Sequence, residues 1–305
     1  MRPYSHAMTF RKRLALAIAL LTCVPLGRFA LLAGQTPRQM REGYAAVPGA
    51  RLFYIDSGGA GIPVVFLHAA TGTTRAWQYQ VPAFTAAGYR VIAYDRRGWG
   101  KTIVEVNGPA GTGADDLLGL LDALKLDRVH LVATAAGGFV AFDFVLSFPA
   151  RLRSVTVADS LGGVRDKEVL DLETRIRPPE FDALPAEVRE LGPMYRAANP
   201  DGTRLWNEIE RESRPSVPKG TSTLQLAYSV PLRNQLSLAL FQQIRIPTLI
   251  LAGGADMSAP PPLMKLFAAR IKDAEFAVVP NAGHSSYWEE PDTFNRAVLD
   301  FIRKK

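Results

Sequence analysis

The stretch VHLVATAAGG at residues 129–138 constrains the fold more than any other part of the chain. It begins as an apolar run, ends in small residues, and is followed at once by the apolar spacing of a helix from Phe139 onward. Small residues let a strand turn sharply into a helix, because little side-chain volume lies in the way. The stretch therefore predicts a buried strand, a tight turn and a helix that packs closely against the strand.

Apolar runs with the length of buried strands also occur on both sides of this turn. They are found at residues 63–67, 89–94, 154–158, 247–252 and 275–279. Helical patterns separate them, at residues 74–87, 114–124, 139–148, 262–271 and 291–302. Alternation of buried strands and helices is typical of a doubly wound, mostly parallel sheet. The predicted fold class is therefore α/β, with two short strands at 44–47 and 51–55 in front of the alternation.

The chain changes character between residues 161 and 243. Prolines interrupt short helical segments there, and no buried strand pattern is present in the sequence. A helical insertion of this kind would lie over the sheet as a lid and shape a pocket. We therefore expect a core made of residues 35–160 and 244–305, with a helical lid at 161–243.

Residues 1–34 have the character of a targeting sequence. Basic residues at 11–13 precede an apolar segment, Leu14 to Leu26, which is shorter than the roughly 20 residues of a membrane span. We expect an exported protein, periplasmic or secreted, whose leader is either cleaved near residue 34 or kept as a membrane anchor. The only cysteine, Cys23, lies in this segment, so a disulfide framework and a cysteine nucleophile are excluded for the rest of the chain.

The net charge of +7 is concentrated in the same segment. Residues 1–34 hold five basic residues and no acidic one, which leaves 31 basic and 29 acidic residues for the rest of the chain. Because that remainder is nearly neutral, we expect no nucleic-acid partner. The sequence has no H-E-x-x-H pattern, no Cys/His cluster and no Walker lysine, so we expect neither a metal nor a cofactor.

Five motifs, in their order and spacing, resemble the α/β-hydrolase superfamily from about Tyr44 to the C-terminus, and in particular its lidded esterases and lactonases. They are LHAATG at 67–72 (oxyanion loop), DRRGWG at 95–100 (D-x-R-G-x-G turn), ATAAGG at 133–138 (nucleophile elbow), LILAGGAD at 249–256 (acid strand) and NAGH at 281–284 (histidine loop). In the G-x-S-x-G elbow of this superfamily, a serine stands on the strand-to-helix turn. Here Ala133 takes the place of the first glycine, and Ala135 takes the place of the serine.

The resemblance implies that Ala135 is at the nucleophile position, with Asp256 as the acid and His284 as the histidine. His284 can also be argued from its position, on a glycine-flanked loop at the carboxyl edge of the predicted sheet, where ligands of such sheets bind. Histidine has the pKa that a general base needs. Asp256 is expected to orient His284, and Asp159, which also ends a strand, is the alternative acid.

The backbone N–H groups of Ala70 and Ala136 are implied as the oxyanion hole, which requires no particular side chain. His68 closes a buried strand beside the oxyanion loop, and we expect it to position that loop. His130, near the start of a strand, is expected to be a surface or strand-end residue.

The alanine at position 135 leaves two interpretations open. In the first, Ala135 is an engineered substitution that lets a substrate bind without turnover, and the natural enzyme is a serine hydrolase. In the second, the alanine is natural, which the departure at Ala133 and the intact leader favour. A relocated nucleophile is a further alternative, with candidates Ser160, Ser258, Ser285 and Ser286.

We expect hydrolase-type chemistry on a small, partly apolar carbonyl substrate such as an ester or a lactone. His284 and Asp256 would act beside an oxyanion hole, without a cofactor. Two alternatives belong to other classes. The same His–Asp pair could catalyse an elimination, a C–C cleavage or a cofactor-free oxygenation, or the protein could be a catalytically idle binder of a small ligand.

Overall fold

The computed structural model describes residues 40–177, 180–213 and 228–305. The predicted leader lies outside the described residues, so its cleavage, its role as an anchor and export itself stay predictions. Across the described ranges, no helix is both long and apolar enough to cross a membrane.

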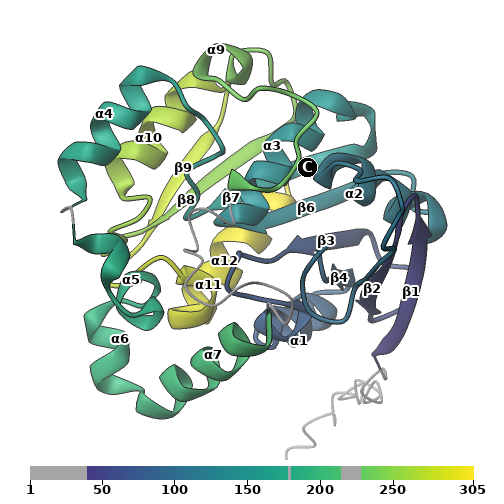
Figure 1. Ribbon diagram of the computed structural model, residues 1–305, viewed down its shortest axis with the longest axis horizontal. Helices are drawn as coiled ribbons and strands as arrows, with labels where there is room; N and C mark the ends of the chain where they lie inside the picture. Colours follow the sequence, from purple (N-terminus) through teal and green to yellow (C-terminus); the bar gives the residue numbers. More distant parts are fainter. Residues whose placement is uncertain (1–39, 178–179, 214–227) are drawn as a thin grey trace, which may run out of the picture. The chain divides into compact units, whose positions relative to one another are not determined.

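In the part of the chain that the structure describes, nine strands form one mixed sheet (Figure 1). They are β1 (Arg41–Val47), β2 (Ala50–Asp56), β3 (Pro63–Leu67), β4 (Arg90–Tyr94), β5 (Ile103–Val104), β6 (Val129–Thr134), β7 (Leu152–Ala158), β8 (Thr248–Gly253) and β9 (Glu275–Val279). Their order is β1-β2-β4-β3-β6-β7-β8-β9, with β5 paired to β2. The pairs from β4–β3 through to β8–β9 are parallel, whereas the pairs that β2 forms are antiparallel. This is the predicted doubly wound α/β fold.

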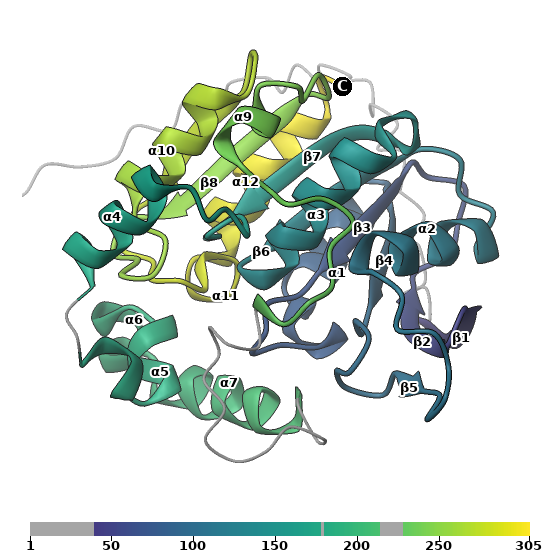
Figure 2. The same ribbon diagram turned by 45° about the horizontal axis from the view of Figure 1, so that its top comes forward.

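Helices cover both faces of this sheet (Figure 2). The core helices are α1 (Gln80–Ala86), α2 (Gly113–Ala123), α3 (Ala136–Ser147), α10 (Pro261–Arg270), α11 (Ser286–Glu289) and α12 (Pro291–Ile302), with short 3-10 turns η1 (Thr74–Trp77) and η2 (Pro149–Arg151). Strand β3 illustrates burial on both faces of the sheet. Val65 and Leu67 belong to the apolar cluster under α2, α3 and α10. The alternate residues Val64 and Phe66 belong to the cluster under α1 and α12. Alternate side chains of a strand point to opposite faces, so both faces must be apolar.

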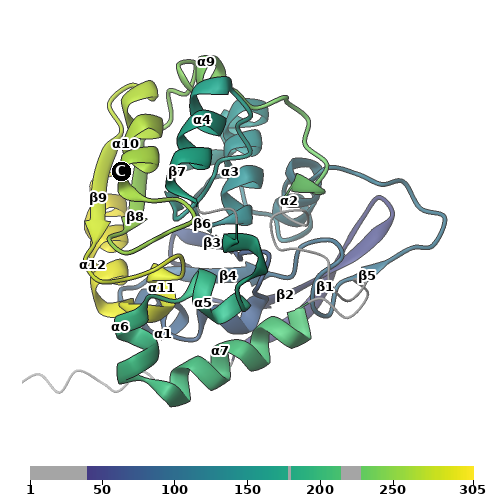
Figure 3. The ribbon, with the colours of Figure 1, turned by 60° about the vertical axis from the view of Figure 1, so that its left-hand side comes forward.

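The segment between β7 and β8 contains the remaining described helices. They are α4 (Lys167–Ile176), η3 (Phe181–Ala183), α5 (Ala186–Glu190), α6 (Pro193–Ala198), α7 (Pro200–Ser213) and α9 (Leu238–Phe241). Figure 3 shows α5, α6 and α7 as a layer of their own near α11, whereas α4 lies beside α3 and α10. The boundaries 161 and 243 of an independent lid stay a prediction.

Two groups of contacts hold this layer to the core. The side chain of Arg75 in η1 forms ion pairs with Glu208 and Glu212 of α7. The N–H of Gly192, between α5 and α6, donates to the carboxylate of Glu289 in α11 at 2.7 Å. The layer is therefore joined to the core both at η1 and beside the histidine loop.

The expectation for His130 was half right. His130 lies at the start of β6, as expected for a strand-end residue, but it is buried rather than at the surface, and its Nδ1 lies 2.7 Å from the Ser154 hydroxyl of β7. Burial, with the nearby Arg153 charge, lowers the pKa of His130 to about 4, so the ring is neutral near pH 7. The Ser154 hydroxyl, on the neighbouring parallel strand, gives this polar ring a hydrogen-bond partner in the buried interior.

Candidate active site

The turn between β6 and α3 holds Ala135 at φ 47° and ψ −120°. A side chain at positive φ is strained, and such strain persists where surrounding bonds hold it. Here the Ala135 N–H donates to Ala158 O at 3.0 Å. The Ala135 carbonyl accepts from Ser160 Oγ at 2.6 Å and from Gly138 N at 2.9 Å. The predicted sharp turn is therefore present and fixed by the neighbouring strand β7.

The glycines behind the turn are needed for its close packing. A Cβ on Gly137 would lie 2.5 Å from the carbonyl oxygen of Leu67 in β3. A Cβ on Gly138 would lie 2.4 Å from Ser160 Oγ. Because contacts shorter than 3.0 Å do not occur at real Cβ atoms, α3 can approach β3 this closely only with glycine at position 137.

His284 and Asp256 are brought together at the carboxyl edge of the sheet, by the loops that follow β9 and β8. His284 Nδ1 lies 2.8 Å from Asp256 Oδ2, and both side chains are buried. The other carboxylate oxygen accepts from the N–H groups of Ser258 at 2.7 Å and Ala259 at 3.0 Å. These bonds fix the carboxylate, which in turn fixes the proton on Nδ1 and leaves Nε2 free to exchange a proton with a ligand.

The carboxylate of the alternative acid, Asp159, forms its hydrogen bonds with groups other than His284. Its carboxylate accepts from Gly253 N at 2.7 Å and from the Ser286 hydroxyl at 2.5 Å. It thereby connects the end of β7 to β8 and α11. Of the two predicted acids, Asp256 is the one with a hydrogen bond to His284.

The pKa of His284 is raised to about 9. Burial of the ring acts against its charged form, but the charges of Asp256, Glu190 and Asp159 and the Asp256 hydrogen bond outweigh burial. In this arrangement both ring nitrogens of His284 are therefore protonated near pH 7, and the ring carries a positive charge.

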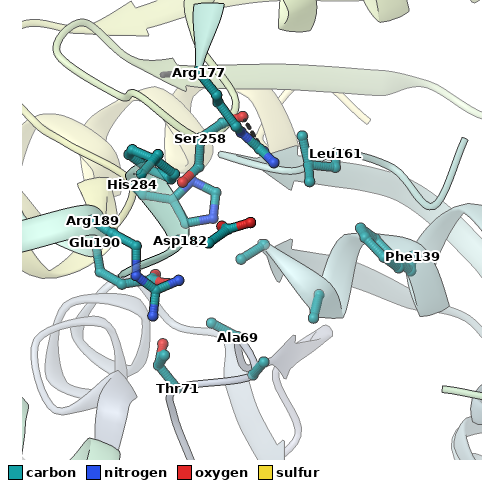
Figure 4. A pocket seen from close by; sticks show the side chains of 14 residues that line it. Ala69, Thr71, Phe139, Leu161, Arg177, Asp182, Arg189, Glu190, Ser258 and His284 are labelled. Carbon is teal, nitrogen blue, oxygen red and sulfur yellow. Dashed lines mark hydrogen bonds between the residues drawn. The ribbon is translucent and has the colours of Figure 1, made fainter. Parts of the chain in front are cut away.

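A cavity of about 50 Å³ lies in front of His284 (Figure 4). It is lined by Ala69, Ala70, Thr71, Ala135, Ala136, Phe139, Leu161, Arg177, Phe181, Asp182, Arg189, Glu190, Ser258 and His284. The four residues predicted for the nucleophile position, the oxyanion hole and the base thus share one lining, and Asp256 lies behind His284.

The segment between β7 and β8 adds charged groups that the sequence analysis missed. Glu190 at the end of α5 is buried, and burial raises its pKa. Arg177 Nη2 donates to Ser258 O at 2.8 Å, while its Nε has no hydrogen-bond partner within the described ranges. Arg189 donates from Nε to Leu184 O at 3.1 Å. These charged groups join an otherwise mostly apolar lining, and no sequence motif marks them.

The oxyanion loop is held by one side chain and one backbone N–H of the loop after β4. Trp99 Nε1 donates to Ala70 O at 2.8 Å, and the N–H of Arg96 donates to His68 Nε2 at 3.0 Å. Burial, with the charge of Arg96, keeps the pKa of His68 well below its usual range, so its other nitrogen, Nδ1, carries the single proton and donates to Ala69 O at 2.6 Å. His68 therefore positions the loop, as expected from the sequence.

The four serines considered as alternative nucleophiles have different surroundings. Ser160 and Ser286 donate their hydroxyls to Ala135 O and to Asp159. Only Ser258 of the four belongs to the pocket lining. Among the described residues, no three His, Cys, Asp or Glu side chains are grouped as metal ligands would be.

Comparison with known proteins identifies relatives of this chain. The model of the alpha/beta hydrolase family matches residues 64–297. The 2-hydroxy-6-oxononadienedioate/2-hydroxy-6-oxononatrienedioate hydrolase of Paraburkholderia xenovorans is 28% identical over 287 residues, which cover 87% of this chain and 93% of that protein.

Solved structures agree with this. The thermophilic esterase of Thermogutta terrifontis, with malate bound, superposes with a TM-score of 0.67 at 26% identity and covers 87% of this chain and 98% of its own. A bromoperoxidase of Bacillus anthracis gives a TM-score of 0.66 at 25% identity, over 86% of this chain and 100% of its own.

Proposed function

Since the chain belongs to the alpha/beta hydrolase family, we propose that it is an enzyme that acts on the carbonyl group of a small ester-like or lactone-like substrate. In this proposal Ala135 stands at the position of the family's nucleophile. The observation that carries the proposal is a single pocket lined by His284, Ala135, Ala70 and Ala136, with Asp256 bound to His284 at 2.8 Å.

The proposed oxyanion hole uses backbone donors. Ala136 is the first residue of α3, and the first N–H groups of a helix have no carbonyl partner within it. Together with the N–H of Ala70, this donor would stabilise negative charge that develops on a carbonyl oxygen. Neither donor depends on the missing serine.

His284 would carry out proton transfer, with Asp256 fixing its tautomer. A methyl group at position 135 cannot form an acyl-enzyme, so water would attack the carbonyl directly, or the neutral form of His284, present as the pH approaches its pKa of about 9, would remove a proton next to the carbonyl. In a serine triad, loss of a catalytic side chain leaves about 10³–10⁴-fold catalysis over water, which comes from the oxyanion hole and binding.

We further propose that the substrate carries a carboxylate. Arg177 and Arg189 line the pocket, and Arg177 has an Nε without a hydrogen-bond partner in the described part of the chain. Arginine binds carboxylates through two parallel hydrogen bonds. The hydrolase of Paraburkholderia xenovorans is named for a dioate, and the Thermogutta esterase holds malate.

A second candidate is proton transfer without hydrolysis, as in elimination, C–C cleavage or cofactor-free oxygenation. It is favoured by Glu190, which lines the same pocket and raises the pKa of His284 together with Asp256. A protonated imidazole and a carboxylate in one pocket can donate and accept a proton in the same step.

The deciding experiment compares the chain as given with Ala135→Ser, His284→Ala and Ser258→Ala variants. The panel contains aryl esters, lactones and enolisable ketones, each with and without a carboxylate. We expect the chain as given to turn over a carboxylate-bearing member, to lose that activity with His284→Ala and to keep it with Ser258→Ala.

The Ala135→Ser variant separates the two interpretations of the alanine. If a serine belongs there, this variant forms an acyl-enzyme with a burst of product and labels with a fluorophosphonate. If Ser258 were the nucleophile, Ser258→Ala would abolish activity. No turnover by either the chain as given or the serine variant, with ligands still bound, would mean that the pocket is only a binding site.

A further inference from the structure

A second cavity, of about 160 Å³, shares no lining residue with the pocket around His284. Its wall includes Arg96 and Trp99 from the loop after β4, Asp116 from α2, Val140 from α3, and residues 229–231. None of the motifs used above assigns a role to this cavity.

The unusual group in this lining is Arg96. Its side chain is buried, with only 4% of the residue exposed. Its Nε, Nη1 and Nη2 atoms each lack a hydrogen-bond partner in the described parts of the chain. Burial lowers the pKa of Arg96 to about 10, which still leaves the guanidinium charged near pH 7. A buried charge with no partner is strongly unfavourable, so this arrangement calls for an anion.

The neighbouring groups do not supply that anion. Asp116 lines the same cavity, but Arg97 already binds both of its oxygens, at 2.6 and 2.9 Å. Burial raises the pKa of Tyr94 above its usual range, so its hydroxyl stays neutral. His68 is neutral as well. The charge of Arg96 therefore has no carboxylate partner among the surrounding residues that the structure describes.

The geometry favours a planar, bidentate anion. Arg96 Cζ lies over the Trp99 ring, 4.3 Å from the ring centroid. The N–H groups of the guanidinium are without an acceptor among the described residues, and their planar fork matches a carboxylate. The side chains of Val140, Val230 and Pro231 add an apolar wall.

We propose that this cavity binds a small organic carboxylate, with its carboxyl group on Arg96 and a short apolar body against Val140, Val230 and Pro231. The site is separate from the Arg177 subsite suggested for the substrate. It also contacts the oxyanion loop indirectly, because Trp99 donates to Ala70 O at 2.8 Å and the backbone N–H of Arg96 donates to His68. The ligand is either a free organic acid or the acid that the enzyme itself releases.

The test is calorimetric titration with sodium butyrate. Because Arg177 could also bind a carboxylate, the reference protein is the full chain with Arg177→Met. We expect this protein to bind one butyrate, and the Arg177→Met/Arg96→Met double variant to bind it at least tenfold more weakly. Butyramide, the neutral isostere, should not bind. Equal binding of butyrate to both proteins, or no binding to the reference, overturns the proposal.

A second Arg96 variant and a soaked crystal test the site even if the methionine variant does not fold. Arg96→Lys keeps the charge without the planar fork, so it should fold even if the methionine variant does not, and it should bind butyrate more weakly than the reference. A crystal of the reference soaked in 4-bromobutyrate should show anomalous bromine density beside Val140. Inorganic phosphate that binds as tightly as butyrate, or a bromine signal only beside His284, contradicts an organic-acid site at Arg96.

To distinguish the two sources of the acid, turnover by the chain as given is followed with added butyrate. A free acid at a separate site changes turnover without competing with substrate. An acid released by the enzyme itself should bind the reference more tightly than butyrate does. The butyrate titrations and the soaked crystal do not use turnover, so they can fail separately from the proposed function.

Discussion

At Ala135 the backbone adopts a conformation that a residue with a side chain rarely takes, with φ at 47° and ψ at −120°. Bonds from Ala158, Ser160 and Gly138 hold it there. In a family whose elbow presents a serine, such strain supports catalysis, whereas an alanine gains nothing chemically from it. The strain has been kept while the hydroxyl is absent.

This gives a prediction for stability. Ala135→Gly should raise the free energy of unfolding by about 1 kcal/mol, because relief of strain outweighs the added freedom of the unfolded chain. Gly137→Ala should instead lower it by more than about 2 kcal/mol, because its Cβ would clash with Leu67 O. Urea unfolding of both variants measures the two changes. A lower stability for Ala135→Gly would mean that the turn is not strained.

A second prediction concerns the charge around His284. Glu190→Gln removes one of the carboxylates that raise its pKa, so the pKa should fall below about 9. Asp182→Asn is the matched control, because Asp182 lines the same pocket but is not among the groups that raise the pKa of His284. Imidazole NMR titration, with His284→Ala to assign the resonance, measures it. Equal effects of both substitutions would contradict the role given to Glu190.

The sequence was informative for some of these residues and silent for others. Asp256 follows the buried strand β8 and His284 follows the edge strand β9, both at motif positions, so their proximity could be predicted from the family resemblance. The choice between Asp256 and Asp159 required the hydrogen bonds. Glu190 and Arg177 belong to short helices between prolines, and their approach to His284 depends on how that layer packs.

The strands and helices of the core were predictable where burial decides them. The runs that form β3 and β8 are apolar because both faces are covered, and the last predicted helix matches α12 at Pro291–Ile302. The helix predicted at 74–87 is instead η1 followed by α1. Its start is set by a distant group, since Asp95 accepts from the Thr74 N–H.

Strand β5 was missed for a different reason. It has two residues, Ile103 and Val104, and both are exposed. So short a run carries no periodicity, and its pairing with β2 is a tertiary contact. Sequence patterns reveal strands through the burial of their residues, and neither residue of β5 is buried.

The bond that joins the α5–α7 layer to the histidine loop gives a third prediction. The Glu289 carboxylate accepts from Gly192 N at 2.7 Å and from Gly283 N at 2.9 Å. Glu289→Gln replaces one acceptor oxygen with a donor, and a buried N–H left unpaired costs about 1–3 kcal/mol. We expect faster amide exchange across α5–α7, measured by mass spectrometry.

The neighbouring glutamate supplies the control for that experiment. Glu290→Gln changes the same kind of side chain one residue away, and Glu290 is only half-buried. It should leave exchange in α5–α7 unchanged. If both variants, or neither, change the exchange, Glu289 is not what holds the layer.

For the whole molecule, the alternation of buried strands and helices was enough to predict the fold class, and the motifs were enough to predict the family. Neither could predict how many charges the fold buries. Asp159, Glu190, Glu289 and Arg96 are all buried within the described ranges. In a sequence they look like any surface charge, because only the packing of distant segments removes them from water.

These buried groups make the stability of the whole chain depend on pH. His284 has its pKa raised from 6.5 to about 9, so the stability it contributes is complete below pH 6.5 and is lost as the pH rises toward 9. Burial raises the pKa of Glu289 from 4.5 to about 7. Between these two values the folded chain binds a proton that the unfolded chain does not, so stability again falls as the pH rises.

The fourth prediction concerns how the melting temperature depends on pH through His284 and Glu289. The melting temperature should fall from about pH 7 to about pH 9, by at least about 3 °C, which corresponds to about 1 kcal/mol in a domain of this size. Below pH 6.5 the lowered pKa values of His130 and His68 make stability rise with pH, which opposes the contribution of Glu289. Glu289→Gln has no carboxyl group to titrate, so between pH 5 and 7 its melting temperature should fall less, or rise more, than that of the unaltered chain, and between pH 7 and 9 the two should change equally. Thermal unfolding at constant ionic strength measures both slopes. A melting temperature that rises between pH 7 and 9 would mean that His284 does not hold its second proton in the folded chain, and the charge arrangement described around it would be wrong.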